Sequence, residues 1–180
     1  FLKWYLPKVI KKKIQKKIEY KLKLCFLKIL EKLKYKNDIF VHRDFHVSNL
    51  MKVNKNIGVI DAQDALYGNM AYDLASLIDD VRIKTTNKLK ERIFLEFIRS
   101  NKKVDKNKLK NDFEILSVLR NLKIIGIFTR LSIRDKKHNY LKLIPHAWKL
   151  IEYRVTKNHK FKELRSVLDK YFPKKIRKLK

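Results

Sequence analysis

Three side chains in the first half of this chain have the types and spacing to carry out chemistry together. They are Asp44, Asn49 and Asp61. Transfer of a phosphoryl group needs a carboxylate near the acceptor hydroxyl, and oxygen ligands that hold Mg²⁺ on the nucleotide phosphates. Asp44 would supply the first carboxylate. Asn49 and Asp61 would supply the metal ligands, because a carboxamide and a carboxylate form a hard-oxygen pair that suits Mg²⁺.

A hairpin predicted from the hydrophobic pattern brings two of these side chains together. Residues 50–53 and 57–60 are short apolar runs on either side of the turn sequence Asn54-Lys55-Asn56. A three-residue loop would pair the last residue of the first strand with the first residue of the second. Extrapolation of this register places Asn49 opposite Asp61. Opposed residues in an antiparallel pair have Cα atoms about 4.5–5.5 Å apart, so the amide and the carboxylate should be neighbours.

The elements around these side chains are predicted to be mainly helical. Apolar residues recur at steps of three and four after Pro7, which predicts a long amphipathic helix over residues 8–35. The same periodicity predicts further helices over residues 71–83, 87–100, 108–134, 141–155 and 160–171. The 108–134 helix has a wide apolar face and should form the spine of the core, although Gly126 within it costs about 1 kcal/mol relative to alanine.

We expect these elements to form a single domain over residues 1–180 that is mainly α with a small β-hairpin. The long first helix occupies residues 8–35, the catalytic loop and metal-binding hairpin occupy residues 39–68, and a helical subdomain occupies residues 71–171. Hydrophobic residues make up 45% of the chain, which is enough to bury a core of this size.

Composition excludes several other classes of protein. The single cysteine, Cys25, allows no internal disulfide and no cysteine-based metal cluster. Its apolar neighbours predict a buried thiol in a reducing compartment, hence a cytoplasmic protein. No stretch reaches the roughly 20 consecutive apolar residues that a membrane-spanning helix needs. The start lacks both a signal peptide's apolar core and an initiator methionine, so we expect the chain to begin within a longer protein.

The net charge of +28 raises the alternative of a basic protein that binds nucleic acid or a membrane surface. Lysine runs such as Lys11-Lys12-Lys13 are spread along the chain rather than gathered in one stripe. The sequence has no zinc-finger spacing and no RNA-binding aromatic strand. We therefore expect no specific nucleic-acid partner. Most lysines are interpreted as solvated surface, with attraction to polyanions or membranes at low salt as the alternative.

The loop around Asp44 resembles a known catalytic motif. His42-Arg43-Asp44-Phe45-His46-Val47-Ser48-Asn49-Leu50 is similar to the catalytic loop shared by protein kinases and the aminoglycoside phosphotransferase family. Ile60-Asp61 resembles the metal-binding segment of that family. Further segments resemble its cell-wall sugar kinases, which phosphorylate N-acetylmuramate and N-acetylglucosamine at the anomeric hydroxyl with ATP: Trp4-Tyr5-Leu6-Pro7, Ala71-Tyr72-Asp73-Leu74-Ala75, Asp80-Val81-Arg82 and Arg120-Asn121-Leu122-Lys123.

The resemblance implies a role for each matching residue, with ATP and Mg²⁺ as cofactors. Asp44 would be the catalytic base or the carboxylate that orients the hydroxyl, and Asn49 and Asp61 would bind Mg²⁺. His42 and Arg43 would support the loop, and Asp73 would hold the loop backbone from the helix beneath. The remaining candidates for contacts to substrate or loop are His46, Asp64, Arg82, Arg120, Arg130 and Arg134.

The chain also departs from the pattern of related enzymes. Asp61-Ala62-Gln63 stands where protein kinases have Asp-Phe-Gly, which argues against a protein kinase with a phenylalanine-gated switch. No glycine-rich loop and no strand with a phosphate-pairing lysine precede Trp4. The resemblance therefore implies the C-terminal lobe of a protein-kinase-like fold. We expect the N-terminal lobe that covers ATP to be absent from this chain, and the chain to be inactive alone.

Three functions follow from these observations, and the first is favoured. It is an ATP-dependent phosphotransferase acting on a sugar hydroxyl, for N-acetylmuramate or N-acetylglucosamine in cell-wall recycling, present as a fragment. An aminoglycoside or other small-alcohol phosphotransferase is the second. A cationic aminoglycoside suits a chain with 46 basic and 18 acidic residues poorly, whereas an anionic muramic-type acid suits it better. The third is the basic nucleic-acid or membrane-surface binding protein.

Overall fold

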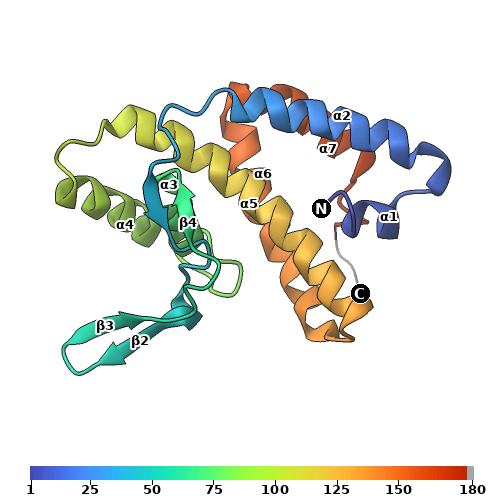
Figure 1. Ribbon diagram of the computed structural model, residues 1–180. Helices are drawn as coiled ribbons and strands as arrows, with labels where there is room; N and C mark the ends of the chain where they lie inside the picture. Colours follow the sequence, from blue (N-terminus) through green and yellow to red (C-terminus); the bar gives the residue numbers. More distant parts are fainter. Residues whose placement is uncertain (178–180) are drawn as a thin grey trace. The chain divides into compact units, whose positions relative to one another are not determined.

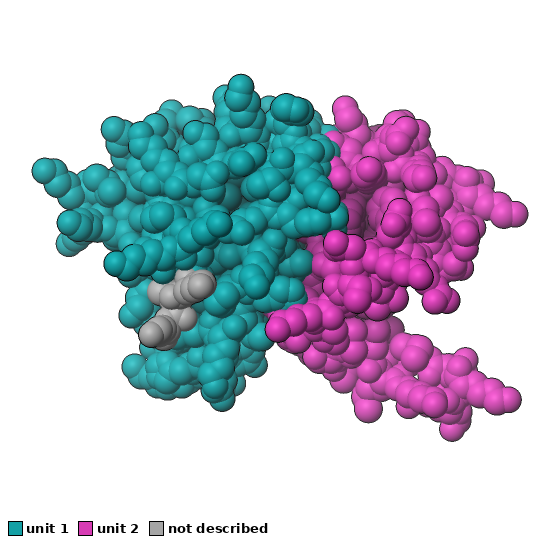
Figure 2. Space-filling model, turned by 180° about the vertical axis from the view of Figure 1, so that it is seen from behind, with its two compact units in different colours: residues 1–32, 118–180 teal, residues 33–117 magenta. Residues whose placement is uncertain are grey.

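The computed structural model describes residues 1–177 and divides them into two compact units, coloured separately in Figure 2. Unit 1 contains residues 1–32 and the chain from residue 118 onward, and it is helical. Unit 2 contains residues 33–117 and, within residues 1–177, all the strands (Figure 1). Helix α5 (Lys106–Arg134) contributes to both units. The prediction of a mainly helical chain with a small antiparallel hairpin is confirmed.

Unit 1 begins with two helices where the sequence predicted one over residues 8–35. They are α1 (Tyr5–Val9) and α2 (Lys12–Leu30). The chain is extended between them, since ψ is 137° at Ile10 and 135° at Lys11. The side chain of Gln15 donates a hydrogen bond to the carbonyl of Ile10 at 2.7 Å, which satisfies an acceptor that the helix break leaves without a helical partner.

The remaining elements of unit 1 follow the second part of α5. Helix α6 (Ile144–Lys157) and helix α7 (Lys162–Tyr171) are each preceded by a 3₁₀ turn. These turns span His138–Leu143 and His159–Phe161. Both helices were predicted, with boundaries that differ by at most three residues.

Helix α2 packs on α7 through one apolar stripe (Figure 1). The stripe consists of Ile18, Leu22, Cys25 and Ile29, which recur at steps of four and three and are all buried. Cys25 is a free, buried thiol, as predicted, and burial raises its pKa. The helix is therefore fixed to unit 1 by one face.

An aromatic cluster forms a second part of the unit 1 core. The ring centroids of Tyr5, Trp148 and Phe172 lie 6.0–6.1 Å from one another, and all three side chains are buried. The Tyr5 hydroxyl donates to the carbonyl of Ile176 at 2.7 Å and accepts from Nε1 of Trp148 at 3.1 Å. Burial raises the pKa of Tyr5 to about 12. The polar ends of these aromatic side chains are thus satisfied inside the core.

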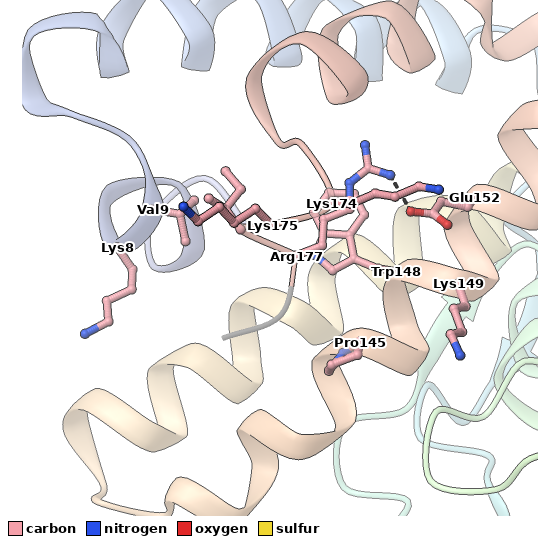
Figure 3. A pocket seen from close by; sticks show the side chains of 10 residues that line it. Lys8, Val9, Pro145, Trp148, Lys149, Glu152, Lys174, Lys175 and Arg177 are labelled. Atoms are coloured by element: carbon pink, nitrogen blue, oxygen red, sulfur yellow. Dashed lines mark hydrogen bonds and ion pairs between the residues drawn. The ribbon is translucent and has the colours of Figure 1, made fainter. Parts of the chain in front are cut away.

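Arg177 closes over this cluster at one edge of a hollow of about 950 Å³ (Figure 3). Its guanidinium carbon lies 4.7 Å from the centroid of the Trp148 ring. The guanidinium also pairs with Glu152 and, at 2.9 Å, with Asp169. A buried guanidinium with two carboxylates and a ring as partners anchors the last described segment of the chain. Lys174 and Lys175 line the same hollow.

Helix α5 runs without interruption through Gly126, as the predicted helix over residues 108–134 requires. A Cβ atom at this position would lie 2.1 Å from the backbone nitrogen of Phe1. The glycine therefore permits a close approach between α5 and the first described residue. Glycine has a lower helix propensity than any other residue except proline, but any side chain at this position would clash with the backbone of Phe1.

Unit 2 carries two small antiparallel sheets and two helices of its own. Strand β1 (Ile39–Val41) pairs with β4 (Leu66–Gly68), a long-range pairing that the sequence did not predict. Helix α4 (Asn87–Ser100) has the predicted bounds, because Thr86 caps it by accepting from the backbone N–H of Leu89. The core of the unit consists of Ala71, Leu74, Ala75, Ile78, Leu109, Phe113 and Leu116.

Helix α3 (Ala71–Ile78) is shorter than the predicted helix over residues 71–83. The two carboxylates that follow it stop the helix. Asp79 is buried, and it accepts from Lys90 Nζ at 2.6 Å and from the Ser117 hydroxyl at 2.5 Å. Asp80 Oδ1 accepts from the backbone N–H of Arg82 at 3.1 Å. Asp79 is thus held by side chains of other elements, whereas Asp80 bonds a local backbone group and so competes with continuation of the helix.

The predicted hairpin exists, but its predicted register is wrong by one residue. Strand β2 (Leu50–Val53) pairs with β3 (Asn56–Val59), so Leu50 lies opposite Val59 and not opposite Ile60. The loop has two residues, and the first, Asn54, has a φ of 53°. Both strands are largely exposed on both faces, so no buried face specifies the register and the turn decides it. Asn49 is therefore not paired with Asp61.

Candidate active site

The carboxylate of Asp73 on α3 holds the backbone of the loop that carries Asp44. Asp73, in the first turn of α3, accepts from the backbone N–H of His42 at 2.7 Å and from that of Arg43 at 2.9 Å, one bond to each oxygen. Backbone donors bound to an ionised carboxylate form strong hydrogen bonds. The negative charge is also favourable near the amino end of a helix. These two bonds fix the backbone immediately before Asp44.

Replacement of Asp73 by asparagine should destabilise unit 2 by about 1–3 kcal/mol, because the amide can accept only one of the two backbone bonds and loses the charge. Urea unfolding measures this loss. Hydrogen exchange of residues 40–50 should also become faster in the Asp73→Asn variant. Asp38→Asn is the matched control, since Asp38 is exposed and its replacement should change stability by less than about 0.5 kcal/mol. Equal stability of the two variants would contradict the anchoring role of Asp73.

The backbone of Ile60, the residue before Asp61, is hydrogen-bonded to the loop that carries Asp44. The N–H of Ile60 donates to the carbonyl of Asn49 at 3.1 Å. The carbonyl of Ile60 lies 3.0 Å from Nε2 of His42, a buried side chain. With the proton on Nε2, this ring donates to Ile60, so both backbone groups of Ile60 are bonded to the loop. Asp61 therefore directly follows a residue whose backbone is bonded to Asn49, although Asn49 and Asp61 are not cross-strand partners.

Two residues of this site have backbone conformations that are rare for non-glycine residues. The φ angle is 73° at Arg43 and 72° at Asp61. Such conformations cost about 1–3 kcal/mol each and persist where surrounding contacts enforce them. The contacts are present: Arg43 Nη1 donates to the carbonyl of Asp64 at 3.1 Å, and Gln63 Nε2 donates to Asp61 Oδ1 at 2.6 Å. The strain lies at the residue before the predicted catalytic Asp44 and at the predicted metal ligand Asp61 itself.

The side chain of Asn49 is oriented by the loop itself. Its Nδ2 donates to the carbonyl of Asp44 at 3.0 Å, which leaves the amide oxygen as the atom that could bind a cation. The same carbonyl accepts from the backbone N–H of His46 at 2.9 Å. Asn49 is buried, whereas Asp44 is partly exposed and Asp61 is exposed. The arrangement combines a fixed amide with carboxylates that solvent and ligand can reach.

This donor set fits Mg²⁺ bound together with a nucleotide. Among residues 1–177, no three His, Cys, Asp or Glu side chains form a group that could hold a metal ion by themselves. Mg²⁺ usually keeps several water molecules and binds through one or two protein oxygens and the phosphates of its substrate. One carboxylate, Asp61, and one amide oxygen, Asn49, meet that requirement.

The other predicted candidates lie in several environments. His46 is buried within the loop. The Asp64 side chain is exposed, and its carbonyl rather than its carboxylate contacts Arg43. Arg82 pairs with Asp80 at 3.1 Å. Arg120, Arg130 and Arg134 lie on α5 in unit 1, where Arg120 is buried and Arg134 pairs with Asp135 at 2.7 Å. Contacts of these residues with a substrate stay predictions.

Two buried polar residues that support the site were not predicted. Asp112 accepts from the backbone N–H groups of Lys34 and Tyr35 at 2.8 and 2.9 Å, and from Asn69 Nδ2 at 2.8 Å. Asn69 Oδ1 in turn accepts from the N–H of Ala71 at the start of α3. Asp112 thus ties the segment before β1 to the helix that carries Asp73. It also gives the amides of residues 34 and 35 a side-chain acceptor on α5 in place of a helical carbonyl, so the predicted extension of the first helix to residue 35 does not form.

Comparison with protein families matches residues 4–101 to the phosphotransferase enzyme family. The matched segment covers more than half of the chain and includes the loop, the hairpin and α3. The chain belongs to this family. The resemblance seen in His42-Arg43-Asp44 and Asn49 is therefore confirmed at the level of the family.

Individual relatives of this chain share one name that is more specific than the family. The N-acetylmuramate/N-acetylglucosamine kinase of Neisseria meningitidis serogroup B is 32% identical over 151 residues, which are 81% of this chain and 45% of that protein. The kinase of the same name from Pseudomonas aeruginosa is 34% identical over 139 residues, 72% of this chain and 40% of that protein. The one from Caulobacter vibrioides is 30% identical over 146 residues. The chain spans less than half the length of these relatives.

Proposed function

We propose that the protein containing this chain is an ATP-dependent phosphotransferase that acts on a hydroxyl group of an N-acetylated amino sugar. The observation that carries the proposal is the loop geometry. Asp73 fixes the backbone before Asp44, and Ile60, the residue before Asp61, donates a backbone hydrogen bond to the carbonyl of Asn49. Family membership and the names of the relatives support the same reaction class.

In the proposed reaction Asp44 accepts or orients the proton of the acceptor hydroxyl. Asn49 and Asp61 would hold Mg²⁺, which when bound neutralises charge on the phosphates of the nucleotide. Phosphoryl transfer requires mostly positioning from the protein, so the fixed backbone around Arg43 and Asp61 is suited to it. His42 positions the Ile60 carbonyl and does not need to exchange a proton.

N-acetylmuramate and N-acetylglucosamine are the proposed substrates, with the anomeric hydroxyl as the acceptor. The relatives named for these sugars match 72–81% of the chain. Muramic acid carries a carboxylate, and a chain with a net charge of +28 attracts an anion more readily than a cationic aminoglycoside. This favours the sugar kinase over the antibiotic phosphotransferase.

The part of the protein that would cover ATP is proposed to lie outside this chain. Unit 2 exposes large apolar side chains on both of its sheets, among them Phe40 at 64%, Ile57 at 64% and Tyr67 at 75% exposure. Exposed apolar side chains grouped on a small unit favour contact with further protein. A second lobe, absent from this chain, would give them a partner.

A substrate panel tests the proposal on the complete reading frame that encodes this chain. With ATP and Mg²⁺, we expect turnover with N-acetylmuramate and N-acetylglucosamine and at least about tenfold lower kcat/KM with an aminoglycoside, a difference of about 1.4 kcal/mol in transition-state binding. Phosphate release without an acceptor is the background measurement. Preference for the aminoglycoside would replace the sugar assignment but keep the reaction class, whereas no turnover with any alcohol would contradict both.

A further inference from the structure

Helix α2 has a second apolar stripe that faces solvent. Tyr20, Leu24 and Leu27 recur at steps of four and three and are 65%, 41% and 57% exposed. They are offset by two residues from the buried stripe that begins at Ile18 and Leu22. At about 100° per residue this offset is about 200°, so the two stripes lie on opposite sides of the helix. One side packs on α7, and the other has an apolar surface where a solvated helix normally has polar residues.

The charge of α2 is as unusual as its apolar pattern. The helix contains seven lysines and one acidic residue, Glu19, which is paired with Lys23 at 2.7 Å. Lys16 and Lys17 are exposed and lie on either side of the solvent-facing stripe, one helical turn before Tyr20, and the exposed Lys13 lies one further turn toward the amino end. The exposed side of α2 is therefore an apolar line bordered by positive charge.

A shallow hollow beside the stripe adds to the positive border. It lies between α2 and α7 within unit 1, has a volume of about 550 Å³, and is lined by Leu24 together with Lys21, Lys28 and Lys162. Lys28 is paired with Glu163 at 2.9 Å. The row of lysines therefore extends from α2 onto α7, where Lys162 lies.

We propose that this face of α2 binds the surface of an anionic lipid bilayer. A helix with lysines beside exposed Leu and Tyr can lie in the interface, where apolar side chains enter the acyl boundary and lysines meet acidic headgroups. The opposite face stays on α7, so binding needs no rearrangement of the core. No described helix is both long and apolar enough to cross a membrane, and the proposed binding is peripheral.

The size of the stripe favours a lipid surface over a protein partner. Tyr20 and Leu27 are about 10 Å apart along the helix axis at a rise of 1.5 Å per residue. A stable protein interface buries about 800 Å² on each partner, which three side chains on a convex helix do not provide. Interfacial binding has no such threshold, because it grows with each apolar side chain and each lysine that reaches the surface.

Co-sedimentation of the 180-residue chain with vesicles tests the proposal. We expect binding to vesicles of phosphatidylcholine with phosphatidylglycerol and little binding to phosphatidylcholine alone. Replacement of Tyr20, Leu24 and Leu27 by glutamine, a good helix former, should weaken the partition coefficient at least about tenfold without changing the helical content. Replacement of Lys13, Lys16 and Lys17 by glutamine should weaken it roughly fivefold for each lysine.

The matched control removes the same charge elsewhere. Lys102, Lys103 and Lys110 of unit 2 are exposed, and their replacement by glutamine should change the partition coefficient less than about twofold. An equal loss in this control would show attraction by net charge alone and overturn the proposal. The proposal would also be overturned if the glutamine variant of the stripe bound like wild type, or if wild type bound neutral vesicles equally well.

Two further measurements exclude other occupants of the same face. Size-exclusion chromatography of the wild type and of the variant lacking the apolar stripe should give the same monomer. A dimer that the stripe variant loses would assign the face to a second copy of the chain. A polyuridine RNA should compete with vesicles only through the lysines, so tight RNA binding that requires Tyr20, Leu24 and Leu27 would overturn the lipid assignment.

Discussion

Asp44→Asn should lower kcat by about 10²–10⁴-fold while the affinity for ATP with Mg²⁺ stays unchanged, because a positioned base contributes about that much and is not a metal ligand. The asparagine should leave the loop intact. The two loop hydrogen bonds at this residue, from Asn49 Nδ2 and from the His46 N–H, go to the backbone carbonyl of Asp44, which the substitution keeps. A loss of rate would therefore report on the carboxylate itself.

The measurement is steady-state turnover with N-acetylmuramate, together with calorimetric titration of ATP. It uses the complete reading frame, since the chain spans 40–45% of the length of the kinases from Caulobacter vibrioides and Neisseria meningitidis and the second lobe is proposed to lie outside it. Asp38→Asn is the control: it removes one carboxylate four residues before His42, at an exposed position of the same unit. Rates within twofold of wild type in the Asp44 variant would remove Asp44 from the mechanism.

The helices were predicted well where the signal is local. The α4 prediction succeeded because the Thr86 cap and the apolar periodicity after it act within a few residues. The α2 prediction was wrong at its carboxyl end because Asp112, 77 residues beyond Tyr35, binds the backbone there. No pattern near residue 35 indicates that partner. Long-range polar contacts are the part of the fold that periodicity leaves undetermined.

In the candidate site, too, the local motif was predicted correctly and the longer-range pairing was not. The motif placed Asp44, Asn49 and Asp73 in one region, and the structure gives Asp73 the two backbone contacts that the resemblance implied. The geometric argument for Asn49 and Asp61 was wrong in its register, because exposed strands do not fix their pairing. The link that the structure shows is to the residue before Asp61. Ile60 is bonded to Asn49 through its N–H and to His42 through its carbonyl, and these contacts are not readable from hydrophobic pattern.

This revised geometry sharpens the test of the metal site. Asp61→Asn should weaken ATP binding in the presence of Mg²⁺ at least about 100-fold, about 2.7 kcal/mol, because the site loses its charged metal ligand. Asparagine is the informative replacement, since it tolerates a φ of 72° better than alanine does. Asp61→Ala should lose the same binding and add backbone strain, seen as a lower urea midpoint than that of Asp61→Asn.

Titration of ATP with Mg²⁺ and with EDTA separates metal binding from nucleotide binding. Wild type should bind more tightly with Mg²⁺, and Asp61→Asn should bind equally weakly in both conditions. Gln63→Ala is the matched control, because it removes the hydrogen bond to Asp61 Oδ1 but keeps the carboxylate. It should retain most of the Mg²⁺ dependence. If Asp61→Asn kept the full Mg²⁺ dependence, the metal would be held elsewhere, and the link from Asn49 through Ile60 would be structural only.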